Sequence, residues 1–162
     1  MKTELFRLEL LEGKQVRLLV GAEMALSDEG PVWSDPAVPC LQLTTLYFCL
    51  ENDQTVKLAS FHNDHGAEFL LEESSAPELD EGAAGDIYRT RNLNELGSGK
   101  LKSVTTEGQD GVEVWHFQLG SAEIVLVAGE VEDEGDGYRF RRPDESILVF
   151  SPPERLDLID WD

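Results

Sequence analysis

Apolar and polar residues alternate with a period of two through most of this 162-residue chain. Residues 112–119 show the pattern most clearly, because Trp115, Phe117 and Leu119 fall on one side and mostly polar residues fall between them. This period is typical of β-strands, whose successive side chains point to opposite faces of a sheet. The pattern therefore predicts a chain that is mostly β, with little helix.

Turn signals divide the alternating segments into hairpins. Gly120-Ser121 follows the segment 112–119 and is typical of a two-residue type II′ turn, in which glycine takes a positive φ at the first position. The apolar run 124–128 that comes next predicts a strand covered on both faces. A similar hairpin is predicted for residues 46–60, with its turn at residues 51–53. These hairpins indicate an antiparallel arrangement of neighbouring strands.

Length and composition fit one domain with its own core. The chain has 162 residues, of which 41% are hydrophobic, and domains of this size normally form one core. We count about nine or ten strands, separated mostly by short connections. The sequence therefore predicts a single-domain antiparallel sandwich or a partly open barrel.

Two parts of the chain, about residues 44–75 and 113–144, resemble each other at a constant offset. Phe48-x-Leu50 corresponds to Phe117-x-Leu119. The next strand of each hairpin also corresponds, since Val56-x-Leu58-Ala59 matches Val125-x-Val127-Ala128. One interpretation is a pseudo-repeat of two similar halves. The alternative is that two unrelated hairpins look alike at this level of detail.

The chain carries 33 acidic and 13 basic residues, which gives a formal net charge of −20. No Lys or Arg occurs between Lys57 and Arg89, or between Lys102 and Arg139. A field of this sign repels nucleic acid and anionic membranes and attracts basic surfaces. We therefore expect no nucleic-acid partner, no membrane partner, and a basic protein partner for the acids of these two windows. The candidate partner-binding residues are Glu72, Glu73, Glu78, Asp80 and Glu81 in the first window and Glu130, Glu132, Asp133, Glu134 and Asp136 in the second.

This charge distribution favours a non-enzymatic acidic binding protein. Immunity proteins neutralise nuclease toxins by placing carboxylates where the toxin would hold phosphates, and electrostatic complementarity of this kind speeds encounter and sets specificity. By this analogy, an immunity-type or inhibitor-type role against a basic partner such as a toxin is the leading hypothesis. The alternatives are a well-solvated acidic protein without a charge-selected partner, and a structural or oligomeric domain such as a homodimer joined through a sheet edge.

One local cluster contains residue types that bind metals. Residues 62–65 read His-Asn-Asp-His, and this fragment resembles the H-x-D-H motif of metallo-β-lactamase-like hydrolases, where it follows a strand and binds zinc. The resemblance covers four residues, and Ser60 stands where that family has a further histidine. A catalytic zinc needs at least three protein ligands, so the site requires the strand at residues 112–119 to lie beside this loop. The alternative is a polar turn. The candidate metal ligands are His62, Asp64, His65 and His116, and a further alternative function is a small metal-dependent hydrolase or metal-binding protein that uses His62, Asp64 and His65.

The remaining signals concern the compartment. An acidic residue, Glu4, stands where a secretory signal would need apolar residues. No stretch approaches the ~18 apolar residues of a membrane-spanning helix. Cys40 and Cys49 allow at most one disulfide, and we expect both to be buried free thiols in a reducing cytosol. We therefore expect a cytoplasmic protein that uses no cofactor.

Overall fold

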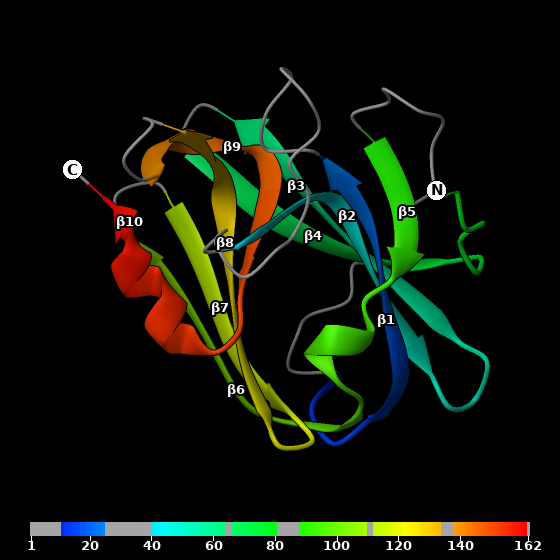
Figure 1. Ribbon diagram of the computed structural model, residues 1–162. Coiled ribbons are helices and arrows are strands. Elements are labelled where there is room, and N and C mark those ends of the chain that lie inside the picture. The colour runs from blue at the N-terminus through cyan, green and yellow to red at the C-terminus, as the bar shows by residue number, and fades with distance from the viewer. Residues whose placement is uncertain are drawn as a thin grey trace.

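β-Strands dominate the structure, a computed structural model that describes residues 11–24, 40–63, 66–80, 88–109, 112–133 and 138–161 (Figure 1). The strands are β1 (Gln15–Met24), β2 (Leu41–Leu50), β3 (Thr55–Asn63), β4 (Gly66–Ser74), β5 (Tyr88–Asn92), β6 (Gly99–Gln109), β7 (Val112–Leu119), β8 (Ala122–Asp133), β9 (Tyr138–Phe150) and β10 (Ile159–Asp160). Two short 3₁₀ helices, η1 (Asn94–Leu96) and η2 (Pro153–Leu158), complete these segments.

Six of the strands close into a barrel in the order β9, β2, β3, β4, β7, β8, with β8 pairing back onto β9. Strand β1 pairs with β2 and carries β5 along its second half, and its first residues also meet β6. Most pairings are antiparallel, while β4 with β7 and β9 with β10 run parallel. The predicted β-rich barrel with little helix is confirmed.

The barrel closes through a narrow junction between β4 and β7. Within the described strands, Ala67 and Val112 are the one residue pair recorded across this junction. The carboxylate of Glu113 adds a second link, because its Oε2 accepts the Phe69 N–H at 2.9 Å and its Oε1 accepts the Trp115 Nε1–H at 2.6 Å. The Phe69 and Trp115 rings meet edge to face at 4.9 Å. A side chain thus supplements strand pairing where the wall is thinnest.

The apolar face of most strands fills the barrel interior. Phe48 and Phe117 come from opposite hairpins and their ring centroids lie 6.0 Å apart. Both are nearly inaccessible to solvent, as are Leu46 and Leu58 on the β2–β3 hairpin. Burial of apolar side chains contributes about 1.5–3 kcal/mol for each large residue. This interior is therefore the main source of stability.

A second apolar layer covers the outside of β8 and β9. Val125 and Val127 point away from the interior and pack with Phe150, Ile159 and the half-buried Leu156. Ile159 belongs to β10, which pairs with β9, and Leu156 belongs to η2, the helix drawn in red in Figure 1. The prediction that residues 124–128 form a strand covered on both faces is confirmed.

Both predicted hairpins are present. At the β7–β8 turn Gly120 has a φ of +59°, as the type II′ prediction requires. A Cβ built at Gly120 would lie 2.5 Å from the carbonyl oxygen of Ser98, so the turn packs directly on the backbone that precedes β6. Glycine is required there by both conformation and space.

The pseudo-repeat can be followed strand by strand. Phe48 and Phe117 both point into the interior. The second strands differ, because Val56 lies in the interior while Val125 belongs to the outer layer. Phe48 pairs with Val56, whereas Phe117 pairs with Ile124, and a register step of one residue turns a side chain to the other face. The sequence match therefore joins residues on opposite faces, and the duplication itself stays a prediction.

Candidate partner-binding surface

The first group of predicted acids lies where β4 ends. Glu72 and Glu73 are on β4, and Glu73 pairs with Val56 at the start of β3. The chain then continues to Asp80, whose backbone exchanges two hydrogen bonds with Thr90 of β5, with N–O distances of 3.0 and 2.6 Å. This bridge fixes the segment after β4 to the edge of the sheet.

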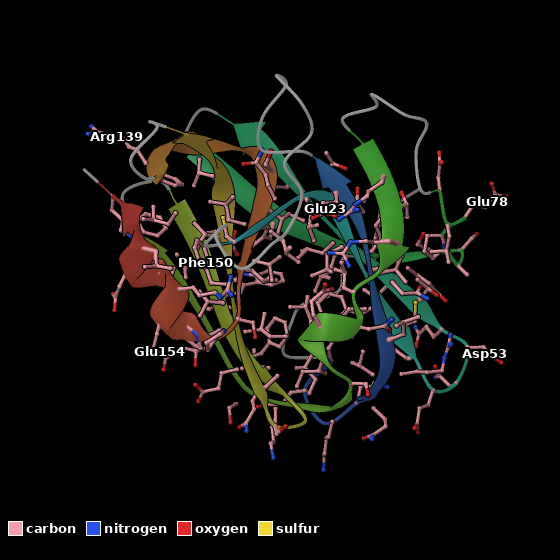
Figure 2. All side chains as sticks on the ribbon, viewed as in Figure 1. Glu23, Asp53, Glu78, Arg139, Phe150 and Glu154 are labelled. Carbon is pink, nitrogen blue, oxygen red and sulfur yellow. The ribbon has the colours of Figure 1, made fainter. Side chains whose placement is uncertain are left out.

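The β3–β4 register brings two further acids to this side of the molecule. Glu51 and Asp53 lie in the β2–β3 turn, and both are exposed. Figure 2 shows Asp53 and Glu78 on the same side of the barrel. Sequence reasoning did not include these turn residues, because their proximity to β4 depends on the register. The exposed set formed by Glu51, Asp53, Glu73, Glu78 and Asp80 is termed the acidic face.

Lys57, the basic residue next to the acidic face on β3, is ion-paired. Its Nζ lies 2.9 Å from Oε1 of Glu72, and the two side chains are 33% and 29% exposed. Glu72 is therefore partly neutralised, unlike its neighbour Glu73. An exposed pair of this kind contributes about 0–1 kcal/mol to stability. Its larger effect is to leave the acidic face without an unpaired lysine at this position.

Two arginines of β5 are also ion-paired, to the buried Glu23 of β1. The Nε atoms of Arg89 and Arg91 lie 2.7 and 2.9 Å from Oε1 of Glu23, whose side chain is 2% exposed. Arg91 Nη1 lies 2.9 Å from Oε2 of Glu95. Burial by itself lowers the pKa of Arg91, but hydrogen bonds and charges from Glu23 and Glu95 outweigh it and raise that pKa. These arginines hold the sheet together.

The second group of predicted acids lies elsewhere. The β8–β9 register sets Glu130 opposite Arg142 and Glu132 opposite Arg139. Figure 2 shows Arg139 and Glu78 on opposite sides of the molecule. The described backbone of the second group, which pairs with β9 at Arg139, therefore lies on a different side of the molecule from Glu78. Asp133 ends β8, and Glu81, Glu134 and Asp136 lie outside the described residues.

The predicted metal ligands are only partly placed. His62 lies near the end of β3, directly opposite Ala67, which in turn pairs with Val112. His116 lies four residues beyond Val112 on β7, which places it about 13 Å from Val112 at ~3.3 Å per residue. The fold thus does not bring His116 beside His62. Asp64 and His65 lie outside the described residues.

Metal binding at the loop after β3 stays a prediction. Among the residues that the structure describes, no group of three His, Cys, Asp or Glu side chains is arranged to hold a metal ion. Elemental analysis of protein purified without chelators would test the hypothesis, which requires about one zinc, iron or manganese per chain.

The two cysteines are buried and free, as predicted. Burial raises the pKa of Cys40 to about 12, although the positive charge of Arg155 acts in the opposite direction. Only a thiolate is a good nucleophile or metal ligand. Cys40 is therefore an inert core residue at neutral pH.

Comparison of this chain with protein-family models, with curated proteins and with solved structures finds no match. No helix within the described segments is both long enough and apolar enough to cross a membrane. The case for a function therefore rests on the charges and contacts of this fold.

Proposed function

We propose that this chain is a non-enzymatic binding protein whose acidic face receives a basic surface of a partner protein. The supporting observation is that the acids on this side of the barrel are exposed, while the bases beside them are held in ion pairs. Lys57, Arg89 and Arg91 are taken up in ion pairs with Glu72 and Glu23. The five carboxylates of the acidic face are exposed. A partner with exposed lysines or arginines would supply positive charge to these carboxylates.

The acidic face is held in place by the backbone. The turn that carries Asp53 is closed by hydrogen bonds from Gln54 N–H to Asn52 Oδ1 at 3.1 Å and from Leu50 N–H to the Gln54 carbonyl at 2.8 Å. The Asp80–Thr90 bridge fixes the other end. Preorganised charges lose little conformational entropy on binding, so more of the electrostatic attraction appears as affinity. An immunity-type or inhibitor-type role against a basic protein, such as a toxin, is the specific form of this proposal.

Two double variants with the same change in net charge test the proposal. Glu73→Gln with Glu78→Gln removes two of the five charges of the acidic face, and Glu123→Gln with Glu154→Gln removes two exposed charges elsewhere. Figure 2 shows Glu154 and Glu78 on opposite sides of the barrel. Each protein is used to capture partners from its native cell extract, and any captured protein is then purified and titrated by calorimetry.

We expect a basic partner that binds the wild type and the control with affinities within about twofold of each other. Its affinity for the acidic-face variant should fall by about tenfold or more, since loss of a close charge pair costs about 1.5 kcal/mol or more. Raising salt from about 0.05 to 0.5 M should weaken binding, because screening shortens the range of the field. Equal binding by both double variants would contradict the proposal.

A further inference from the structure

Four exposed basic residues gather where β1 meets β6. Gln15 pairs with Lys100 and Val16 pairs with Gly99, so the first residues of β1 lie beside the start of β6. The Leu101 N–H donates to the Lys14 carbonyl at 2.9 Å, which adds Lys14 to the junction. Lys14, Arg17, Lys100 and Lys102 are all exposed and are termed the basic corner.

Strand geometry directs three of these side chains to one outer face. Val16 and Leu101 are 1% and 0% exposed and point into the barrel. Side chains alternate along a strand, so Arg17, Lys100 and Lys102 point outward. Neighbouring and diagonal side chains on paired strands lie about 5–8 Å apart. The corner therefore concentrates positive charge on a small area.

The basic corner differs from the other described bases in having no partner. Lys57, Arg89 and Arg91 form ion pairs, and Arg139 and Arg155 also have interactions. Among the bases whose side chains the structure describes, Lys14, Arg17, Lys100 and Lys102 are the ones with no recorded interaction. In a chain with 33 acids, this leaves an area of concentrated, uncompensated positive charge.

Within the described segments, the strand beside this corner has an open side beyond Val104, whose N–H donates to Glu12 Oε1. β6 pairs with β7 from Leu101 to Gln109, but its other side pairs with β1 only at Gly99 and Lys100 within the described segments. Thr105 and Thr106 beyond that point are exposed. A free strand edge can take up an extended peptide through main-chain hydrogen bonds.

We propose that the basic corner binds a short acidic segment of a partner protein, which lies extended along the open side of β6. Charge complementarity selects the acidic side chains, and the strand edge selects a peptide backbone. The acidic side chains of the segment lie beside Lys100 and Lys102 and not beside Glu12, whose carboxylate is held at Val104 of the same strand. A longer polyanion fits poorly, because the exposed Glu12 and Glu51 border the corner. Glu12 Oε1 accepts the Val104 N–H at 3.4 Å, and Glu51 N–H donates to the Gln15 carbonyl at 3.2 Å. Nucleic acid or an anionic membrane would extend over these carboxylates. This surface does not depend on the function proposed for the acidic face.

The probe is a fluorescent synthetic peptide of about ten residues with alternating glutamate and threonine. Anisotropy titration of the wild type at about 0.05 M salt should give saturable binding with a Kd near or below about 100 μM. Lys100→Gln with Lys102→Gln should weaken binding by about tenfold or more. Ser75→Asp with Ala76→Glu gives the same change in net charge at exposed sites after β4, and should leave the Kd within about twofold.

A second form of the peptide tests the strand edge without changing the protein. N-methyl groups at alternate residues keep the charge and remove main-chain donors, so binding should weaken by about tenfold if the peptide pairs with β6. Equal binding of both peptides would overturn the extended pairing. The proposal would also be overturned by no peptide binding up to about 1 mM, by equal loss in the control variant, or by tighter binding of a thymidine decamer or of anionic lipid vesicles. Self-association of the Lys100→Gln/Lys102→Gln protein without peptide binding by the wild type would show instead that the lysines protect the edge from aggregation.

Discussion

Two strands pair with the same edge of β1, β5 near its end and β6 at its start, and their basic residues have opposite environments. On β5, Arg89 and Arg91 turn toward Glu23, which is 2% exposed, and bind its carboxylate. On β6, Lys100 and Lys102 are exposed and form no ion pair within the described segments. Residues of the same charge thus stabilise the fold at one end of β1 and remain available to a partner at the other end.

Register accounts for the difference. Glu23 lies directly opposite Arg89, with Arg91 two residues further along β5, so both guanidinium groups reach one carboxylate. Lys100 lies opposite Gln15, which has no charge to offer. Abundant acid in the chain does not by itself neutralise a base; a carboxylate must be held within about 4 Å. If register decides the difference, the charges around β5 should contribute more to stability than the lysines of β6.

Removal of the Glu23 charge should have the largest effect. Glu23→Gln keeps the size of the side chain but leaves Arg89 and Arg91 without their carboxylate. Loss of one partner of a buried pair costs about 3–5 kcal/mol, and because the arginines are 24% and 21% exposed we expect about 2–3 kcal/mol. Urea denaturation measures the change. In a double-mutant cycle with Arg91→Gln, a coupling energy near zero would show that the pair does not stabilise the fold.

Cys40 should make stability depend on alkaline pH. Burial raises its pKa in the folded chain to about 12, despite Arg155. Between pH ~9 and ~12 the unfolded chain loses this proton while the folded chain keeps it, so the unfolded state binds fewer protons and stability falls as pH rises. The slope should approach 1.4 kcal/mol per pH unit.

Comparison with Cys40→Ala isolates this contribution from other alkaline titrations. Urea denaturation of both proteins between pH ~8 and ~10.5 should show a steeper loss of stability in the wild type, with no difference in slope below pH ~8. Parallel curves would mean that Cys40 is more accessible than its 3% exposure indicates.

Glu95 is the exposed end of the same network that includes Glu23, and its loss should cost little. Its carboxylate lies 2.9 Å from Arg91 Nη1, but its side chain is 46% exposed. Glu95→Gln should lower the free energy of unfolding by about 0.3–0.5 kcal/mol. A loss as large as that of Glu23→Gln would show that burial does not separate the two acids. Thermal unfolding of Glu95→Gln and Glu23→Gln at low and high salt measures the loss of stability in each variant.

The sequence predicts the fold well where one face of a strand is buried. Alternation around Phe48 and Phe117 indicates both hairpins, and the Gly120 turn follows from backbone chemistry alone. The alternating pattern does not predict β6. Within the described segments one side of this strand is mostly unpaired, and it carries exposed polar residues such as Thr105 and Thr106. β6 also contains a bulge near Ser103, whose φ is +57°, and an extra residue interrupts the period of two.

The candidate surfaces are harder to predict, because they depend on register between distant strands. Glu73 is evident from the charge pattern, but its proximity to Asp53 requires the β3–β4 pairing. Glu23 lies outside the hairpins that the alternating pattern predicts, so its pairing with Arg89 is not foreseen. The net charge predicts the charge of a partner. The pairing of strands determines which charged side chains stay exposed and able to bind it.

Neutralising the basic corner should have the smallest effect on the fold. Lys100 and Lys102 are exposed and form no ion pair within the described segments, so Lys100→Gln with Lys102→Gln should change the free energy of unfolding by less than about 0.5 kcal/mol. Residual destabilisation should shrink with added salt, since only long-range attraction to the many acids is lost. A cost of 2 kcal/mol or more, about that of Glu23→Gln, would place these lysines with the arginines of β5 as structural residues. If the free energy of unfolding does not change, binding is the property that distinguishes the β6 end of β1 from the β5 end.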